Sequence, residues 1–435
     1  MTTTKNNEHK NIKVPNKREQ NQTCLDSAER EGLRPKGNVP NLRFPEFQGE
    51  WKKTTIGEIA TIKNGPFGSV LHAEDYVDEG MPIVTTEHFK SGNLPLSKNG
   101  IPQVSEDDYC RLKGYMLETD DIVFSRVGSV DINAHVEHVQ QGWLFSGRVL
   151  RVRPIKSVNS LCLHYVLSTE SVKRDIRNRA VGQTMPSINT PILSNTGIYM
   201  SQSEAEQKKI ANLLSIIDER IATQNKIIED LKKLKSAIID YAINSLDSGF
   251  VKFGSLYEMA GEGGTPTTSN ASFYDNGKIP FIKIDDLKQK YLTENKDFIT
   301  ELGLQKSSAW LVPTHSILFS NGATIGEISI TTYPVCTKQG ILGIVPKQNI
   351  DVEFLYYFMS SSYFKKAVSR IVTEGTMKTA YLKDINNILC PIPTKEKQQE
   401  IAKMPSALNS KIDFEQSILK LFCSQKQHLL RQMFI

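Results

Sequence analysis

The segment from Ser203 to Ile243 contains neither proline nor glycine. Its apolar residues recur at intervals of three and four, which is the spacing of one face of an α-helix. At about 1.5 Å per residue, a helix over the whole segment spans about 60 Å. Few compact domains contain such a helix, so the segment predicts a rod whose apolar stripe needs a partner. The stripe consists of Ile210, Leu213, Leu214, Ile217, Ile221, Ile228, Leu231, Leu234 and Ile238.

The same pattern recurs 191 positions later in the chain. Segment 207-QKKIANLLSIIDERI aligns without a gap with 398-QQEIAKMPSALNSKI, and the globular parts correspond more loosely, as in 122-IVFSRVG and 317-ILFSNGA. This repeat predicts a tandem duplication in which each half is one globular domain followed by one long helix. The matched apolar positions are Ile210 and Ile401, Ala211 and Ala402, Ile217 and Leu408, Ile221 and Ile412, Ile228 and Leu419, Leu231 and Phe422, Ile238 and Leu429, and Ile239 and Leu430.

The predicted fold class is α+β. Two mixed α/β domains are separated by two long helices that pair as an antiparallel coiled coil, with a pseudo-twofold relation between the repeats. Pairing is expected because each helix has one apolar stripe that cannot remain exposed. The predicted core of the pair consists of Ile210, Leu214, Ile217, Ile221, Ile228, Leu231 and Ile238 in the first helix, and Ile401, Leu408, Ile412, Leu419, Phe422 and Leu429 in the second.

The expected domain boundaries follow changes in composition along the chain. Residues 1–40 are polar and lack hydrophobic periodicity, which predicts a disordered arm. Short alternating apolar segments between Gly- and Pro-marked turns predict the globular domains. We expect a first domain at 41–200, a first long helix at 201–245, a second domain at 246–393 and a second long helix at 394–435.

Two local features concern the ends and the regularity of the helices. Ser203 followed by Glu206 predicts a capping box at the start of the first helix. Pro405 occupies the position of Leu214 in the second helix, where it removes a backbone donor. We therefore expect Pro405 to kink the second helix or to delay its start.

The bulk composition is that of an ordinary soluble protein, with 39% hydrophobic and 23% charged residues. Its apolar runs fall short of the roughly 18 residues that a membrane span needs. The polar N-terminus has no apolar signal segment, and the cysteines do not form a Cys-x-x-Cys pair. These features predict a cytoplasmic protein with reduced thiols and no membrane partner.

Charge is segregated within the first domain, although the net charge of the whole chain is only +5. Residues 59–145 hold six basic and thirteen acidic side chains, whereas residues 146–182 hold eight basic side chains against Glu170 and Asp175. Contacts to nucleic-acid phosphates need such a local surplus of lysine and arginine. The alternative is a solvated basic face balanced by its acidic neighbour.

Motifs of catalysis are missing. The sequence has no adjacent prolines for the Asn/Asp-Pro-Pro-Tyr loop of amino-methyltransferases, and no Phe-x-Gly-x-Gly. Gly277-Lys278 lacks the remaining features of a P-loop. His135 and His138 have metal-ligand spacing without a second ligand pair, and surface histidines are the simpler interpretation. We assign no catalytic residue, no metal ligand and no cofactor. An enzyme with an unrecognised nuclease or methyltransferase site remains an alternative, as does a coiled-coil adaptor unrelated to DNA.

Several segments, in this order and duplicated, resemble the specificity subunits of Type I restriction–modification enzymes. In that family, two variable target-recognition domains are each followed by a conserved long helix. The similarity extends over residues 38–435. The segments that carry it are 51-WKKTTIGEIATIKNGPFGS, 204-EAEQKKIANLLSIID, 263-GGTPTT, 317-ILFSNGATIG, 337-TKQGILGIVP and 429-LLRQMFI.

The resemblance implies a non-catalytic subunit that binds double-stranded DNA. Each target-recognition domain would read one half of a bipartite, asymmetric site, and the helical rod would set the spacing of the halves. The rod would also dock modification subunits, expected to be two. Those subunits would bind S-adenosylmethionine, and motor-nuclease restriction subunits would use ATP and Mg²⁺.

Side chains that can discriminate bases in a DNA groove are Arg, Lys, Asn and Gln. Arg151 and Arg153 alternate with Val152, so they are expected on one face of a strand. For any single candidate the alternative is simple solvation. The predicted DNA-binding residues are Arg126, Arg151, Arg153, Lys173, Arg174 and Gln183 in the first domain, and Asn321, Lys338, Gln339, Lys365, Lys366 and Lys378 in the second.

Overall fold

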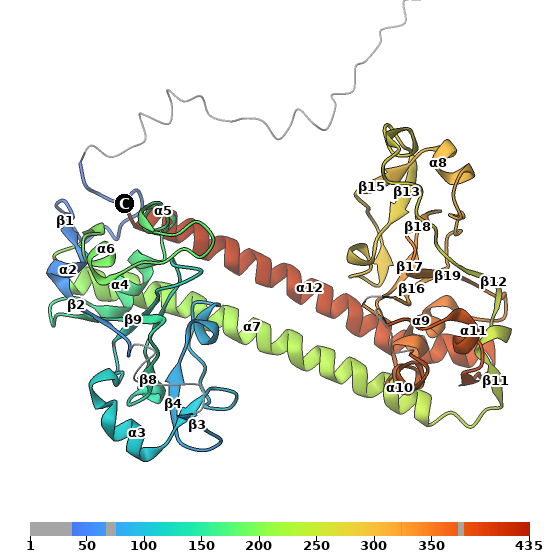
Figure 1. Cartoon of the computed structure of the whole chain (residues 1–435), viewed down its shortest axis with the longest axis horizontal. Coiled ribbons are helices and arrows are strands. Elements are labelled where there is room, and N and C mark those ends of the chain that lie inside the picture. Colours follow the sequence, from blue (N-terminus) through green and yellow to red (C-terminus); the bar gives the residue numbers. More distant parts are fainter. Residues whose placement is uncertain (1–36, 67–74, 323, 373–377) are drawn as a thin grey trace, which may run out of the picture. The chain divides into compact units, whose positions relative to one another are not determined.

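The computed structural model of the chain describes residues 37–66, 75–322, 324–372 and 378–435 (Figure 1). Most of the predicted disordered arm therefore lies outside the described residues. By its internal contacts the chain divides into a first unit, Met1–Arg220 with Phe422–Ile435, and a second unit, Ile221–Leu421. Each unit holds one globular domain together with a section of both long helices.

The first unit is built on an antiparallel sheet with the strand order β2-β9-β6-β7. Successive residues of β6 alternate between two cores, because Ile122 and Phe124 pack on one side of the sheet and Val123 on the other. A second sheet has the order β3-β5-β4-β8, and β1 pairs with β10. The strands are β1 (Lys52–Thr55), β2 (Ala60–Asn64), β3 (Tyr76–Val77), β4 (Met81–Val84), β5 (Gln103–Val104), β6 (Ile122–Ser125), β7 (Asn133–His135), β8 (Leu144–Phe145), β9 (Val149–Pro154) and β10 (Gly197–Met200).

Helices of the first domain pack mainly on the Ile122 side of this sheet, where α4 contributes a nearly continuous buried segment. Asn159 caps α4 through its side-chain oxygen, which accepts from the Cys162 N–H at 2.9 Å. The α-helices in chain order are α2 (Ile56–Ile59), α3 (Glu106–Arg111), α4 (Ser160–Leu167), α5 (Glu170–Arg179), α6 (Thr190–Ser194) and α7 (Glu204–Asn244), with 3₁₀ turns η2 (Thr86–Phe89), η3 (Lys113–Tyr115) and η4 (His138–Gln140).

The second unit repeats this architecture. Its main sheet has the order β12-β19-β16-β17, extended by β14, which runs parallel to β17. A smaller sheet has the order β15-β13-β18, and β11 pairs with β20. The strands are β11 (Phe250–Lys252), β12 (Tyr257–Glu262), β13 (Ile279–Ile282), β14 (Tyr291–Leu292), β15 (Asp297–Ile299), β16 (Ile317–Ser320), β17 (Ile328–Thr331), β18 (Cys336–Thr337), β19 (Ile341–Pro346) and β20 (Leu389–Pro391).

The helical elements of the second unit also follow the order of the first. Asp351 caps α9 as Asn159 caps α4, with its carboxylate accepting from the Phe354 N–H at 2.9 Å. The elements are α8 (Glu301–Gln305), α9 (Val352–Ser360), α10 (Ser362–Ile371), α11 (Leu382–Ile385) and α12 (Lys395–Met433), with 3₁₀ turns η5 (Phe253–Ser255), η6 (Ala271–Phe273) and η7 (Ile284–Asp286).

The duplication thus extends from the helices to the sheets. Strands β2, β9, β6 and β7 have the same neighbours as β12, β19, β16 and β17, and the parallel pair β4–β8 corresponds to β13–β18. At the start of the long helices Gln207 accepts from the Asn159 N–H, and Gln398, 191 positions later, accepts from the Asp351 N–H. Both distances are 2.8 Å. The α+β class with mixed sheets is confirmed.

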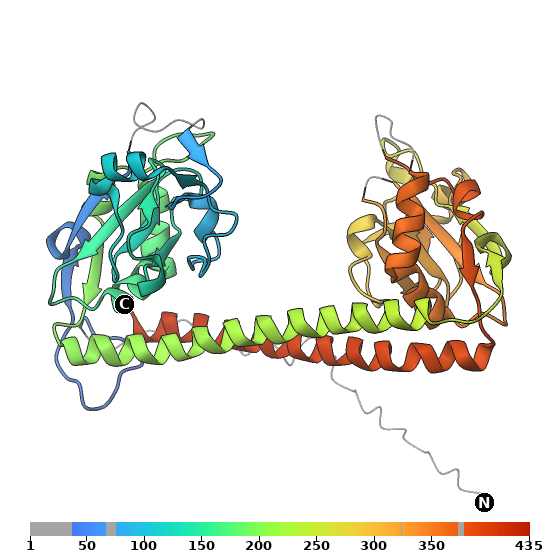
Figure 2. The same cartoon turned by 90° about the horizontal axis from the view of Figure 1, so that it is seen from below.

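The two long helices run antiparallel in each unit (Figures 1 and 2). In the first unit Lys426 of α12 pairs with Asp218 of α7 at 2.5 Å. In the second unit Lys235 of α7 donates to Asn409 of α12 at 3.0 Å. With an offset of 191 positions, Lys235 corresponds to Lys426 and Asn409 to Asp218, so the two contacts are equivalent with the helices exchanged.

When two equivalent helices pair antiparallel, equivalent residues face each other at the centre of the pair. Gln224 and Glu415 form such a contact. The two residues are 191 positions apart, and the Gln224 amide donates to both the carbonyl and the carboxylate of Glu415. Both side chains are buried. A residue that contacts its own repeat counterpart lies where a twofold axis between the two helices passes.

Some predicted helix-pair residues are part of the domain cores, since Ile210 and Leu214 pack in the first core and Ile401 packs against the second. Leu234 of the sequence stripe is instead 48% exposed, because the neighbouring Lys235 faces α12. Of the predicted core, Ile210, Leu214, Ile217, Ile228 and Ile412 are buried, whereas Ile221, Leu231, Ile238, Ile401, Leu408, Leu419, Phe422 and Leu429 are half-buried.

Two local predictions need correction. Of the two effects expected of Pro405, the delayed start is wrong, because the second helix begins at Lys395 and continues to Met433 with Pro405 buried inside it. The helix starts early because Gln398 anchors its first turn to the Asp351 N–H and the Pro393 carbonyl. The capping box of α7 is only half formed. Ser203 accepts from the Glu206 N–H at 3.3 Å, but the Glu206 carboxylate binds Arg43 at 2.6 Å.

Across the described parts of the chain, every helix falls short of the combined length and apolarity that a membrane crossing requires.

Candidate nucleic-acid interface

Four loops meet at one end of the main sheet of the first unit. They comprise residues 64–66, 126–130, 146–148 and 181–187, and we call them the first loop end. The Arg126 N–H donates to the Arg148 carbonyl at 3.0 Å, and the Gly128 N–H donates to the Pro186 carbonyl at 2.8 Å. Gly65 is required here, since a Cβ atom at this position would lie 2.0 Å from the Ser146 carbonyl oxygen. Backbone bonds therefore fix the relative positions of these loops.

The segment from Val181 to Ser187 forms a closed finger at this end. Val181 and Ser187 exchange two backbone hydrogen bonds, of 2.9 and 2.8 Å. Gly182 has a φ of +102°, which favours glycine, and a Cβ atom there would lie 2.7 Å from the Met185 carbonyl oxygen. Gln183 and Met185 are exposed at its tip, and Met185 is 63% exposed. A rigid finger with exposed tip residues suits contact with a groove.

Some of the basic residues near this finger form ion pairs within the domain, and others form none within the described part of the chain. Arg177 pairs with Asp131 and Glu170, and Arg179 pairs with Asp175. By contrast, Arg148 and Arg174 are exposed and form no ion pair with any residue that the structure describes. Lys173 is half-buried on the same helix, α5, which leads directly into the finger. The Arg126 side chain is half-buried and donates to the Gly147 carbonyl at 3.0 Å.

Arg151 and Arg153 lie on one face of β9 as predicted from their alternation, and both also make contacts within the domain. Arg153 donates to the buried carboxylate of Asp121 at 2.7 and 2.8 Å and to Glu118 at 2.6 Å. The hydrogen bond with Asp121 raises the pKa of Arg153. Arg151 donates to the Met116 carbonyl at 3.4 Å, and burial lowers its pKa. Both arginines therefore serve the interior of the domain.

Replacing Arg153 with Ala should destabilise the first domain by about 3 kcal/mol, because it leaves the Asp121 carboxylate buried without its partner. Denaturant unfolding measures this loss. The matched change Arg148→Ala should leave stability within about 0.5 kcal/mol and lower the salt slope of DNA binding by about 0.9. If Arg153→Ala unfolded at the wild-type midpoint and lowered the salt slope instead, Arg153 would be a phosphate contact.

The second unit has an equivalent arrangement, which we call the second loop end. It comprises residues 263–266, 321–322, 324–326, 338–340 and 378–380. The Asn321 N–H donates to the Gly340 carbonyl at 3.0 Å, and the Ala380 N–H donates to the Asn321 carbonyl at 2.8 Å. The Gln339 N–H donates to the Thr265 hydroxyl at 3.3 Å. Loops from equivalent places in the two repeats therefore meet at equivalent ends of the two sheets.

Asn321, one of the predicted base-reading residues, is buried and not exposed to DNA. Its side chain is 1% exposed, and its amide donates to the Ala380 carbonyl at 3.3 Å. It joins the loops of the second loop end and does not itself reach solvent. Lys338 and Gln339 are exposed on the connection between β18 and β19, and Lys366 is exposed on α10.

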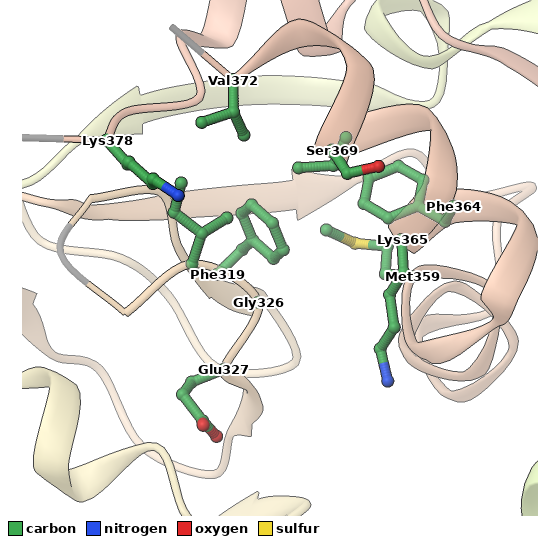
Figure 3. A pocket seen from close by; sticks show the side chains of 11 residues that line it. Phe319, Gly326, Glu327, Met359, Phe364, Lys365, Ser369, Val372 and Lys378 are labelled. Atoms are coloured by element: carbon green, nitrogen blue, oxygen red, sulfur yellow. The ribbon is translucent and has the colours of Figure 1, made fainter. Parts of the chain in front are cut away.

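A cavity of about 600 Å³ adjoins the second loop end. Phe319, Met359 and Val372 supply apolar walls, while Lys365 and Lys378 enter from different elements (Figure 3). Both lysines are exposed. Apolar walls beside lysine ammonium groups can contact base edges and backbone phosphates together.

The structure thus places the predicted residues in three groups. Arg126 and Gln183 lie at the first loop end, and Lys338, Gln339 and Lys378 lie at the second. Lys173 and Arg174 lie on α5, and Lys365 and Lys366 lie on α10. Arg151, Arg153 and Asn321 each make contacts inside their own domain. Sequence reasoning omitted Arg148 and Met185 as site residues. Arg148 lies in the basic stretch 146–182, which is a signal that could have found it. The exposure of Met185 follows from the finger, and a sequence pattern does not reveal it.

His135, interpreted above as a surface histidine, has a side chain that is only 16% exposed and lies 3.1 Å from the Asp120 carboxylate. Within the described segments, no cluster of three or more His, Cys, Asp or Glu side chains could hold a metal ion.

Comparison with known proteins decides the family. Residues 48–233 and 246–421 match the family described as the Type I restriction modification DNA specificity domain. The two matches cover most of the chain, one for each repeat. The chain belongs to this family. The resemblance inferred from sequence is confirmed, and with it the tandem pair of DNA specificity domains.

Relatives named as specificity subunits match the chain over most of their length. The chain is 26% identical over 413 residues to the putative type I restriction enzyme MjaX specificity subunit of Methanocaldococcus jannaschii, covering 87% of this chain and 91% of that protein. It is 23% identical over 397 residues to the MjaVIII specificity subunit of the same organism, covering 86% and 89%. A crystal structure of a Type I restriction–modification S subunit from M. genitalium covers 91% of this chain and 99% of its own, with a TM-score of 0.54 and 18% identity, and shares the fold.

Proposed function

We propose that this chain is the DNA-recognition subunit of a Type I restriction–modification complex and that each globular domain reads one half of a bipartite, asymmetric site. The observation that carries the proposal is the pair of loop ends. Both are built from equivalent loops on equivalent sheets, yet they present different side chains. The first presents Arg126, Arg148 and Gln183, and the second presents Lys338, Gln339 and Lys378. Equal scaffolds with different reading residues fit an asymmetric site.

The chain acts without catalysis of its own. Modification subunits supply S-adenosylmethionine and methylate the DNA, and restriction subunits use ATP and Mg²⁺. We expect the isolated chain neither to methylate nor to cut DNA, because its sequence lacks the cofactor-binding and motor motifs. Methylation and cleavage assays on a preparation free of partner subunits test this expectation. Turnover by such a preparation would establish an enzyme.

The long helices form an antiparallel coiled coil that sets the distance between the half-sites. Support comes from the buried Gln224–Glu415 contact and from the Lys235–Asn409 hydrogen bond. Coiled-coil helices keep a constant separation and direction, so a fixed spacing between DNA halves follows. The complex acts on cytoplasmic DNA.

The coiled coil also docks the modification subunits, of which we propose two. Six large apolar side chains of the helix pair in the second unit are 40% to 77% exposed, and five of them, all but Met404, recur at intervals of seven residues along their helix. Each of the five directly precedes an inward-facing residue of its helix. Consecutive residues of an α-helix are rotated by about 100° around its axis, so each of the five is rotated by that angle, in the same direction, from the inward face. Antiparallel packing brings such positions of both helices to one side. We call this set the docking face: Ile227, Leu234 and Tyr241 on α7, and Phe414 and Leu421 on α12.

Domain exchange tests the division of labour between the two domains. Replacing residues 50–195 with the first domain of a relative should change one half-site and leave the other half-site and the spacing unchanged, because strands β1 to β9 and helices α2 to α6 fall within the exchanged segment while both long helices lie outside it. Methylated-adenine mapping of the hybrid complex reads all three quantities. A change in both half-sites, or in the spacing, would contradict the assignment of one half-site to each domain.

A further inference from the structure

A cavity of about 500 Å³ in the second unit is lined by five lysines from three elements. We call it the elbow cavity, since it lies where the second domain meets the sections of α7 and α12 in the same unit. Lys232 and Lys235 come from α7, Lys288 and Lys290 from the segment that leads into β14, and Lys420 from α12. The acidic side chain among its lining residues is Asp413.

Two of the five lysines form polar contacts that stabilise the folded protein. The Lys290 side chain is 3% exposed, pairs with Glu353 at 2.9 Å and stacks on the ring of Tyr357 at 4.8 Å. Lys235 donates to Asn409 at 3.0 Å. These contacts give Lys290 and Lys235 a structural role that does not require a ligand.

The other three lysines have no such role. Lys232, Lys288 and Lys420 are exposed. Lys288 has one acidic neighbour, Asp285, at 3.7 Å, and that carboxylate is 94% exposed. Over the described residues, Lys232 and Lys420 form no ion pair. Asp413 accepts a hydrogen bond from Asn409 at 3.1 Å. The cavity therefore keeps a surplus of positive charge.

The mutual repulsion of these charges acts on Lys235. Burial lowers the pKa of Lys235, the charges of Lys232, Lys290 and Lys365 lower it further, and Asp413 partly opposes them. A bound anion would offset this repulsion, since an opposite charge within a few ångströms favours the charged form of an amine.

The fold of the repeat does not require these lysines. With the offset of 191 positions, Lys232 of α7 corresponds to Cys423 of α12, and Lys420 of α12 corresponds to Glu229 of α7. The main sheets of the two domains keep the same strand order although the corresponding helix positions differ in this way. A basic residue that is present at only one of two equivalent positions is not needed by the shared fold. Such a residue is a candidate for contact with a ligand that binds at that position alone.

The lining favours phosphate over carboxylate. Arginine, whose planar fork suits carboxylates, is absent among the described lining residues, and the cations are lysine point charges. Gln289, Gln416 and Ser417 add amide and hydroxyl donors of the kind that contact DNA phosphates. We propose that the elbow cavity binds backbone phosphates of the DNA next to the half-site read by the second domain. This inference rests on the proposed function.

The test uses the assembled methyltransferase complex and duplex DNA that contains its recognition sequence. The triple variant Lys232→Gln, Lys288→Gln, Lys420→Gln should lower the slope of log Kd against log salt by about 0.9 for each lost phosphate contact, up to about 3 in total. The methylated sequence should not change. The matched control Lys226→Gln, Lys306→Gln, Lys403→Gln removes three exposed lysines outside the cavity and should keep the wild-type slope.

Neutral methylphosphonate linkages locate the contact. Placed beside the second half-site, they should weaken binding of the wild-type complex and should cost the triple variant little more. Placed beside the first half-site, they should cost both complexes equally. An unchanged salt slope, or equal losses at both places, would overturn the proposal. So would binding of inorganic phosphate to the cavity without an effect on DNA, or a defect confined to subunit assembly, which would indicate an acidic protein partner. In each of these outcomes, continued methylation of a bipartite sequence would leave the proposed function intact.

Discussion

A chain that ends after Ser245 is expected to form a stable homodimer. In the full chain the last turns of α12 complete the core of the first domain, where Leu430, Met433 and Phe434 are buried and Phe434 contacts Trp51 at 6.0 Å between ring centres. Truncation removes these side chains. Each buried aliphatic or aromatic side chain is worth about 1.5–3 kcal/mol, so the exposed core requires a replacement.

A second copy of α7 can supply that replacement. With the offset of 191 positions, Ile239 corresponds to Leu430 and Ile243 to Phe434. Ile239 and Ile243 already complete the second core in the same manner. In an antiparallel homodimer they would enter the first core of the other copy. Lys235 would then face Asp218 of that copy, where Lys426 faces it now.

In this homodimer the side chains of α7 fill the first core less completely than those of α12 do. The difference suggests a variant that restores the missing volume. Ala242 corresponds to Met433, and Ile243 is smaller than Phe434. The double change Ala242→Met, Ile243→Phe in the truncated chain should lower the dimer Kd at least about tenfold, because it restores the missing apolar volume. Analytical ultracentrifugation measures both dimers. A soluble, folded monomer would show that the helices do not stabilise each other as proposed.

The second half of the chain should pair with itself less well. A homodimer of residues 246–435 would place Glu415 against Glu415 at the centre of the helices, where Gln224 meets Glu415 in the full chain. Two carboxylates at a buried contact repel each other. Glu415→Gln should therefore strengthen this dimer, whereas a dimer of the first half needs no such change. With modification subunits, the first-half dimer should methylate a palindrome made of the first half-site and its inverted copy.

The second large effect concerns the docking face. Leu234→Glu together with Leu421→Glu should abolish assembly with the modification subunits, because each change puts a charge on an apolar contact surface. A central apolar contact is commonly worth about 2 kcal/mol or more, so the pair should weaken binding by about three orders of magnitude. DNA half-site recognition by the residual complex should not change.

The control for this experiment adds the same charges elsewhere on the same helices. Ser236 and Ser410 are exposed and lie outside the docking face. Ser236→Glu together with Ser410→Glu should assemble as the wild type does. Co-purification and light scattering of the mixed subunits distinguish the two variants. Equal assembly of both would place the modification subunits on another surface.

The elements that sequence predicted well are those governed by local periodicity. The spacing of Ile210, Leu214 and Ile217 identifies a helix from the sequence alone, and aligning the two halves of the sequence identifies the repeat. The helix pair could therefore be inferred without any knowledge of the domains. Leu234 was misjudged because the inward face drifts along a long helix, and Lys235 took its place.

Site residues were harder, because their roles depend on distant partners. Arg153 belongs to a basic stretch, yet its role follows from Asp121, 32 positions away. Asn321 has the chemistry of a base-reading residue, yet it bonds Ala380, 59 positions away, inside the domain. Lys232 and Lys420 lie on different long helices, and their convergence on one cavity depends on the antiparallel pairing.

Mapping of methylated adenines in DNA modified by the complete complex tests the central claim most directly. Two reading domains on a rod of fixed length predict one bipartite motif, with two different specified halves separated by a constant number of unspecified bases. A single continuous motif, two identical halves, or a variable spacing would contradict it.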